Sequence, residues 1–226
     1  MTPIEDVWGI GRRLRKQMEY FGVKTAYDFT LKSESWVRKE FSVTGLRTWK
    51  ELRGLACIDF EAGNKKKSIT TSRSFSKSIT RFQELYEAVA NFTDACARKL
   101  REQESKAGSL LVYIVTNSHR EDLPQYHNSA SIKLPVPSSD PSEMVKYAKQ
   151  LLQNIYREGY DYKKAGVLVY DIASEGVQTH LFDTIDRSKQ ARLLKVIDSI
   201  KNKAGDDSIS LVIQGPRKIR DFVNKE

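Results

Sequence analysis

Two glycines separated by one residue open a basic segment near the amino terminus. The stretch VWGIGRRLRKQMEYFGVKT (7–25) holds Gly9 and Gly11 just before a cluster of cations, which are Arg12, Arg13, Arg15 and Lys16. Glycine lets the backbone approach an anion closely because no Cβ stands in the way. Amides at a helix start, together with the helix dipole, favour a phosphate there. The segment therefore predicts a helix-hairpin-helix that holds DNA without reading its sequence; the alternative is an ordinary tight turn.

A second stretch, KKKSITTSRSFSKS (65–78), combines cations with hydroxyls. Its cations are Lys65, Lys66, Lys67, Arg73 and Lys77. In a strand, alternation would place five hydroxyls on one face, namely Ser68, Thr70, Ser72, Ser74 and Ser76, opposite Ile69, Arg73 and Phe75. Cations attract phosphates and hydroxyls can bond phosphate oxygens directly. We interpret the stretch as a DNA-contacting strand, the alternative being a solvated edge strand after a basic linker.

A third motif is QTHLF (178–182), in a stretch without strong helix or strand signals. Gln178, Leu181 and Phe182 form the Q-x-x-L-F pattern of bacterial sliding-clamp ligands. Such a peptide binds when its apolar side chains fill a pocket and the glutamine anchors one end. A short pattern also arises by chance. Its place after a DNA-binding module favours the clamp hypothesis.

Residues for catalysis are not grouped in this sequence. Arg120, in SHRED (118–122), is added to the predicted DNA contacts, although a loop of mixed charge is usually only solvated. Paired carboxylates at strand ends, a phosphate-binding glycine loop and a nucleophile constellation are not found. Cys57, Cys96 and three scattered histidines lack metal-ligand spacing. We therefore expect no catalytic residue, metal site or cofactor in this chain.

The elements that would position these motifs fall into two groups. Short helical patterns are predicted over 11–21, 26–31, 35–41 and 46–55. From there on the order β-α-β-β-α-β is predicted: strands at 68–76, 109–116, 129–134 and 166–172, with helices at 81–104 and 141–157. This is the split ferredoxin-like arrangement, an antiparallel sheet with both helices on one face and the other face free. The overall class is α+β.

Domain boundaries follow from these patterns. Residues 1–60 are predicted as a helical module, 61–66 as a basic linker and 67–175 as the sheet domain; 176–187 hold the clamp peptide and 188–226 a partly helical extension of unknown role. The formal net charge of the 226 residues is +9. Within 61–77 five cations face one acid, a net charge of +4, so the basic excess is concentrated where the two modules meet.

Other classes of protein are disfavoured by what the sequence lacks. No apolar run approaches the roughly 20 residues of a membrane helix, and no secretory signal is visible at MTPIEDVWGIG. Two distant cysteines fit reduced, buried thiols. A cytoplasmic, nucleoid-associated protein without membrane partners is expected.

These motifs resemble Y-family translesion DNA polymerases. DVWGIGRRLRKQMEYFGVKTAYDF (6–29) resembles their thumb, and KKSITTSRSFSKSI (66–79) resembles the opening strand of their little finger, a domain with the strand and helix order predicted above. The stretch 178–205 is similar to the UmuC branch, the catalytic subunit of DNA polymerase V. The resemblance covers nearly the whole chain, and nothing matches the catalytic palm domain, so we expect a truncated, C-terminal piece.

The resemblance implies roles for particular residues. Gly9, Ile10 and Gly11 would meet a phosphate through backbone amides. Ser72, Arg73 and Ser74 would meet the template backbone. The clamp peptide would enter the clamp pocket, with Thr179 in place of a common leucine.

The resemblance also implies partners. The parent enzyme would polymerise nucleotides with magnesium, and its further partners would be a UmuD-type accessory subunit and a RecA filament. Two alternatives remain: a ferredoxin-like protein-interaction module without DNA affinity, and an independent enzyme such as a nuclease, which would need a metal cluster.

Overall fold

The computed structural model describes residues 1–57, 65–174, 186–206 and 208–215. The chain divides into two compact units, Met1–Asn64 and Lys65–Glu226. Each unit has its own hydrophobic core, and the two cores have no described residue in common.

The smaller unit is all helical in its described part. It contains η1 (Ile4–Asp6), α1 (Arg12–Tyr20), α2 (Ala26–Thr30), α3 (Glu34–Glu40) and α4 (Val43–Leu52). Its core gathers Met18, Val23, Phe29 and Val37, all with exposed fractions of 0%. Because these helices are short, their stability depends on this shared core rather than on helix propensity.

Local signals fix where these helices begin. Thr25 and Asp28 form a capping box at the start of α2, in which each side chain accepts a hydrogen bond from the other residue's backbone amide. The hydrogen bonds from Thr25 hold the pKa of Asp28 below its ordinary value. Ser33 caps α3 in a similar way, accepting from the amide of Trp36.

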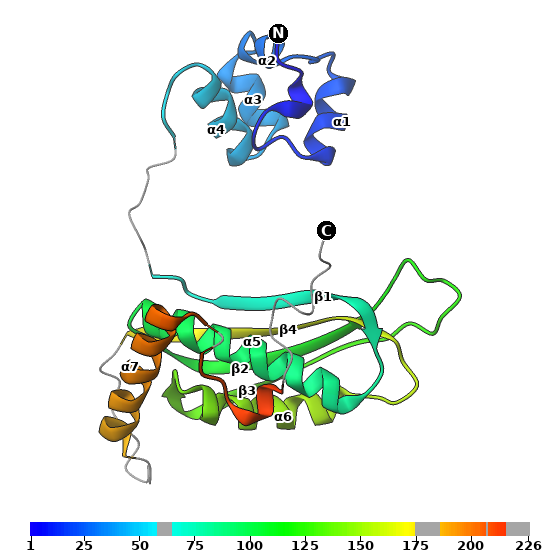
Figure 1. Cartoon of the computed structure of the whole chain (residues 1–226). Coiled ribbons are helices and arrows are strands. Elements are labelled where there is room, and N and C mark those ends of the chain that lie inside the picture. The colour runs from blue at the N-terminus through cyan, green and yellow to red at the C-terminus, as the bar shows by residue number, and fades with distance from the viewer. Residues whose placement is uncertain (58–64, 175–185, 207, 216–226) are drawn as a thin grey trace. The chain divides into compact units, whose positions relative to one another are not determined.

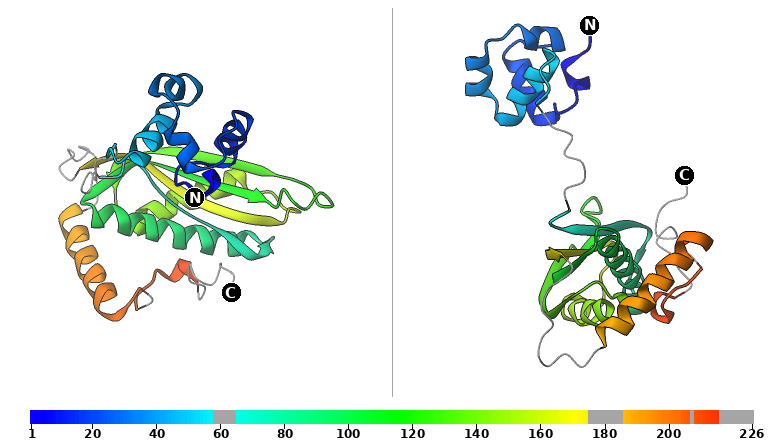
Figure 2. Two further views of the ribbon diagram at one scale, coloured as in Figure 1. Left: turned by 90° about the horizontal axis from the view of Figure 1, so that it is seen from above. Right: turned by 90° about the vertical axis from the view of Figure 1, so that its left-hand side faces the viewer.

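The larger unit is an α+β sandwich of one sheet and two long helices. Its elements in order are β1 (Ile69–Ile79), α5 (Phe82–Glu102), β2 (Ser105–Thr116), β3 (His127–Ser138), α6 (Pro141–Ile155) and β4 (Tyr162–Ser174). Both helices pack side by side on one face of the sheet, and no described helix of this unit lies on the opposite face (Figure 1, Figure 2). The predicted fold class and element order are confirmed.

The sheet has the strand order β1-β4-β2-β3, and every pairing is antiparallel. Strand β4 therefore lies between β1 and β2, although α5 connects β1 directly to β2. Likewise β2 lies between β3 and β4, which α6 connects. Two split β-α-β units are thus interleaved, and β1 and β3 form the edges.

Alternation along the strands explains which face the helices cover. Leu110, Val112 and Ile114 of β2 are completely buried, as are Ala165 and Val167 of β4. They pack against the apolar stripe of α5, which includes Leu85, Val89, Phe92, Cys96 and Leu100. Each large apolar side chain buried here contributes about 1.5–3 kcal/mol relative to an exposed position.

A further helix, α7 (Arg187–Ala204), follows the sheet domain and leads to η2 (Val212–Gln214). Asp186 caps α7 by accepting from the amide of Lys189. Among its side chains, only Leu194 and Lys201 are buried. None of the described helices is both long enough and apolar enough to cross a membrane.

Candidate nucleic-acid interface

Gly9 and Gly11 of the smaller unit have different structural roles. Gly9 has φ +93°, a conformation that side chains other than glycine rarely adopt, and a Cβ there would lie 2.9 Å from Thr48 Oγ1. Gly11 is the N-cap of α1 with φ −84°, and a Cβ there would meet nothing within 4 Å. The fold therefore requires glycine at position 9, whereas glycine at 11 keeps the helix start open toward solvent.

The amides at this helix start are only partly engaged. No side chain caps α1, so its first-turn amides lack an acceptor among the described residues. The Ile10 amide, in contrast, donates to Val7 O at 3.0 Å and the Ile10 side chain is buried. Of the three predicted amide donors, Ile10 is therefore already used inside the turn. Arg12 and Arg13 are both exposed beside the open helix start.

The uncovered face of the sheet is fixed by the strand register. Ser72 of β1 pairs with Gly166 of β4, Gly166 with Tyr113 of β2, and Tyr113 with Ser129 of β3. Residues two positions along each strand share this side. We define the open face as Thr70, Ser72, Ser74, Leu111, Tyr113, Val115, His127, Ser129, Ser131, Lys133, Lys164, Gly166 and Leu168.

The open face has a half-buried, mostly apolar centre and a polar rim. A Cβ at Gly166 would lie 2.4 Å from Tyr113 Cζ, so the tyrosine ring rests in the space that the glycine leaves. Hydroxyls lie on both edge strands, with Ser74 and Thr70 exposed on β1 and Ser129 exposed on β3. Hydroxyl groups at two separate edges suit contacts to sugar–phosphate backbone rather than to one small ligand.

Two lysines extend this rim. Lys164 pairs with Ser74 across β4 and β1, and Lys133 projects from β3 beside Ser131. Both lysines are exposed, and no described residue accepts a hydrogen bond from either ammonium or forms an ion pair with it. Their charge is therefore available to an external anion.

The predicted basic stretch is distributed along the β1 edge. Lys65 Nζ donates to Glu104 O at 3.3 Å, and the Lys66 backbone is held by the Gln103 side chain. Lys67 and Lys77 are exposed. Arg73 lies on the same side of β1 as Phe75, away from the open face. Its guanidinium donates a hydrogen bond to Ser72 O at 2.9 Å. Ser72 is half-buried within the open face, so Ser72 and Arg73 point to opposite sides of the strand.

Arg120 lies in the loop between β2 and β3 and is paired. Its guanidinium donates to both Asp122 carboxylate oxygens, at 2.7 and 2.6 Å. These hydrogen bonds hold the pKa of Asp122 below its ordinary value. Arg120 also lines a cavity of about 200 Å³ with Ser76 and Lys163. Because Asp122 offsets its charge, Arg120 offers a phosphate less than the unpaired Lys133 or Lys164.

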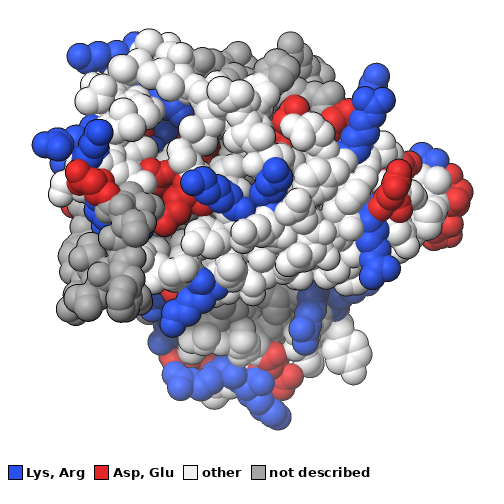
Figure 3. All heavy atoms as spheres, turned by 90° about the horizontal axis from the view of Figure 1, so that it is seen from below, with Lys and Arg blue, Asp and Glu red and all other residues white. Residues whose placement is uncertain are grey.

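Charge is dispersed on the side of the molecule seen from below (Figure 3). Over most of the side seen from below, single Lys and Arg residues are separated by uncharged and acidic ones (Figure 3). The side seen from below therefore carries no continuous basic surface among its described residues (Figure 3), and the candidate DNA contacts are the helix start at Gly11 and the open face.

Comparison with known proteins shows the family to which the chain belongs. Residues 66–181, which include all four strands, match the impB/mucB/samB family C-terminal domain. The chain belongs to the impB/mucB/samB family. The resemblance to the UmuC branch seen in the sequence motifs is thereby confirmed.

Known proteins resemble the chain well beyond the matched domain. Protein UmuC of Salmonella typhimurium strain LT2 is 36% identical over 218 residues, covering 95% of this chain and 52% of the relative. Protein ImpB of Salmonella typhimurium is 34% identical, covering 92% and 50%. DNA polymerase IV of Desulfatibacillum aliphaticivorans is 25% identical, covering 92% and 52%. The chain thus spans about half the length of these relatives.

The predicted clamp motif lies outside the described residues. This holds for Gln178, Leu181 and Phe182 alike, so the clamp contact stays a prediction. Across the described ranges, no group of three or more His, Cys, Asp or Glu side chains is arranged to hold a metal ion.

Sequence reasoning did not include two exposed rim lysines among the candidate DNA contacts. Lys133 stands in the alternating stretch 129–134 on the same face as Ser129 and Ser131, so a signal was present. Lys164 was missed because the last strand begins at Tyr162, earlier than the apolar run at 166 indicated.

Proposed function

We propose that this chain is the DNA-holding and clamp-tethering part of an error-prone translesion DNA polymerase that acts in DNA damage tolerance and SOS repair. Its substrate would be the primer–template duplex, bound without sequence specificity. Polymerisation, with its magnesium ions, would belong to the whole protein, as would a UmuD-type accessory subunit and a RecA filament as partners.

The observation that carries this proposal is the open face. It joins hydroxyls on both edge strands and two lysines without a described partner in one surface that no described helix of the unit covers. DNA backbone contacts commonly come from Lys, Ser and Thr side chains and position a duplex without reading bases. The family relationship supports the same assignment, since one similar protein is named DNA polymerase IV.

The smaller unit would add a second phosphate contact. The uncapped start of α1 presents backbone amides and the positive end of a helix dipole beside Arg12 and Arg13. This combination favours a single phosphate group. Gly9 and Gly11 would serve it differently, Gly9 by shaping the turn and Gly11 by leaving room for the anion.

Duplex affinity tests the role of the open face. Fluorescence anisotropy with a labelled primer–template duplex should show affinity falling steeply between about 50 and 200 mM salt. Lys133→Ala/Lys164→Ala should weaken binding and reduce the slope of log K against log salt by about 2, because each lysine that neutralises one phosphate contributes close to one unit.

A matched variant controls for net charge. Lys146→Ala/Lys189→Ala also removes two exposed lysines, from α6 and α7, outside the open face. It should leave the salt slope nearly unchanged. Equal slopes for both double variants would remove the open face as the binding surface. No measurable duplex affinity at low salt would instead favour the protein-interaction module.

Clamp tethering has a separate test. Leu181→Ala/Phe182→Ala should abolish binding to a bacterial sliding clamp, because these side chains would fill its apolar pocket. Surface plasmon resonance with immobilised clamp measures this, and duplex affinity of the same variant serves as control. Clamp affinity that stays at the wild-type value would show that residues 178–182 are not the clamp ligand.

A further inference from the structure

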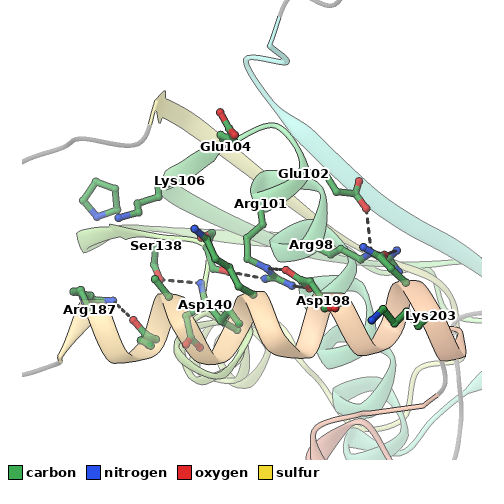
Figure 4. Close-up of a pocket in the computed structure, with 18 residues that line it drawn as sticks. Arg98, Arg101, Glu102, Glu104, Lys106, Ser138, Asp140, Arg187, Asp198 and Lys203 are labelled. Atoms are coloured by element: carbon green, nitrogen blue, oxygen red, sulfur yellow. Dashed lines mark hydrogen bonds and ion pairs between the residues drawn. The ribbon is translucent and has the colours of Figure 1, made fainter.

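A cavity of about 570 Å³ lies in the larger unit between α7 and the adjoining ends of α5, β2 and β3 (Figure 4). None of its lining residues belongs to the open face. The volume is within the range of about 300–1,000 Å³ that small-molecule sites occupy. The cavity is therefore large enough for a small molecule, and it is separate from the open face.

Some of the cations that line the cavity are already neutralised. Arg101 donates to both oxygens of Asp198 at 2.6 and 2.7 Å, so this pair joins α5 to α7 (Figure 4). Arg98 donates to Glu102 at 3.0 Å and also forms an ion pair with Asp206. These pairs build the wall of the cavity and leave little charge for a ligand.

Three lining lysines have no such partner. Lys106 lies on β2, and Lys195 and Lys203 lie on α7. Within the described ranges, no side chain or carbonyl accepts a hydrogen bond from these three ammonium groups. They approach the cavity from two elements that are far apart in the sequence.

The lining carboxylates do not balance these lysines. Asp140 is 7% exposed and accepts the amides of Ser142 and Glu143 as the N-cap of α6. Glu104 is the one lining carboxylate whose oxygens neither accept a hydrogen bond nor form an ion pair with a described residue. The lining side chains comprise six cations and four carboxylates, an excess of two positive charges, and the three lysines are the lining cations without a described partner.

We propose that this cavity binds a phosphorylated small molecule of about nucleotide size. Ammonium groups bind phosphate oxygens as point charges. The hydroxyls of Ser139 and Ser199 line the same cavity as additional donors, and Pro137 and Leu194 give an apolar wall for the remainder of the ligand. Because Lys106 and Lys195 come from different elements, the bound phosphate would also fasten α7 to the sheet.

Nuclear magnetic resonance titration of the full chain tests this site. Inorganic pyrophosphate, and then a thymidine nucleotide, should shift the backbone amides of residues 104–107 and 190–203. Lys106→Ala/Lys195→Ala should raise the dissociation constant at least about tenfold, the change for roughly 1.4 kcal/mol. The variant should keep its fold, because neither ammonium makes a described contact that holds α7.

A charge-matched variant serves as the control for this titration. Lys146→Ala/Lys189→Ala removes the same charge at two positions that do not line the cavity and should bind pyrophosphate like the unaltered chain. The proposal is overturned if dissociation constants exceed about 1 mM for both probes, or if shifts map only to the open face. It is also overturned if a single-stranded thymidine oligonucleotide shifts the cavity amides while pyrophosphate does not, since that would assign the cavity to a nucleic-acid strand.

Discussion

At the scale of single residues, two glycines two positions apart separate a folding requirement from a binding requirement. Gly9 holds a positive φ and packs against Thr48, whereas Gly11 has an ordinary backbone conformation and open space around it. A sequence motif presents both as equivalent. Their environments show that only Gly11 can be replaced without disturbing the turn.

This difference gives a paired prediction. Gly9→Ala should destabilise the smaller unit by about 1 kcal/mol or more, because it places a Cβ at positive φ and against Thr48. Gly11→Ser should leave stability within about 0.5 kcal/mol, because serine is a good N-cap, yet weaken duplex binding by occupying the amides that a phosphate would use. Thermal unfolding and anisotropy distinguish the two. Unimpaired DNA binding by Gly11→Ser would refute the phosphate contact at α1.

Sequence reasoning at this scale succeeds where a residue's chemistry is local. Thr70, Ser72 and Ser74 of β1 share a face, as their alternation in the sequence predicts. Ile10 shows the limit: its amide is used by Val7, which depends on the turn conformation and not on residue type. Lys164 shows a second limit of sequence reasoning, because it comes to lie beside Ser74 only through the pairing of β4 with β1.

At the scale of elements, α7 is attached mainly through charged and polar contacts. Besides Arg101–Asp198, Lys201 Nζ lies 2.9 Å from Asp94 Oδ2 and is only 6% exposed. Arg187 Nη1 lies 2.7 Å from Glu143 Oε2. Leu193 and Val196 instead face solvent, 59% and 56% exposed. The sequence could not show this docking, because charges on a helix ordinarily indicate a solvated face.

Breaking one of these pairs should loosen the helix. Asp198→Ala leaves the mostly buried Arg101 without its bidentate partner, which should weaken docking by about 1–3 kcal/mol. Hydrogen exchange should then accelerate over residues 187–204 and stay unchanged in α6. Arg192→Ala, an exposed change on the same helix, is the control. Unaltered exchange in Asp198→Ala would show that apolar contacts hold α7.

At the scale of the whole molecule, the chain carries two cores and two candidate DNA contacts. The open start of α1 belongs to one unit and the open face to the other. If both bind one duplex, the second contact forms at the effective concentration set by the connection between the units. The element order could be predicted from the periodicity of the sequence. Assigning a candidate DNA contact to each unit required the strand register and the turn geometry at Gly9.

Separating the units should reveal this linkage. Residues 65–226 alone should keep their thermal unfolding midpoint, because every residue of their core is their own. Their duplex affinity should fall at least about tenfold below that of the intact chain, and adding residues 1–57 in trans should not restore it. Calorimetry and anisotropy measure both. Equal affinity of the fragment and the intact chain would show that the smaller unit takes no part in holding DNA.

The position of β4 between β1 and β2 also has a consequence for synthesis on the ribosome. Among the four described strands translation produces β1 first, yet β1 pairs there only with β4, the last of the four. A nascent chain that ends before Tyr162 can form the β2–β3 hairpin but presents unpaired edges on β1 and β2, which are prone to intermolecular pairing. The domain must therefore wait for its final strand, and the cell must keep the growing chain from aggregating until residues 162–174 have left the exit tunnel.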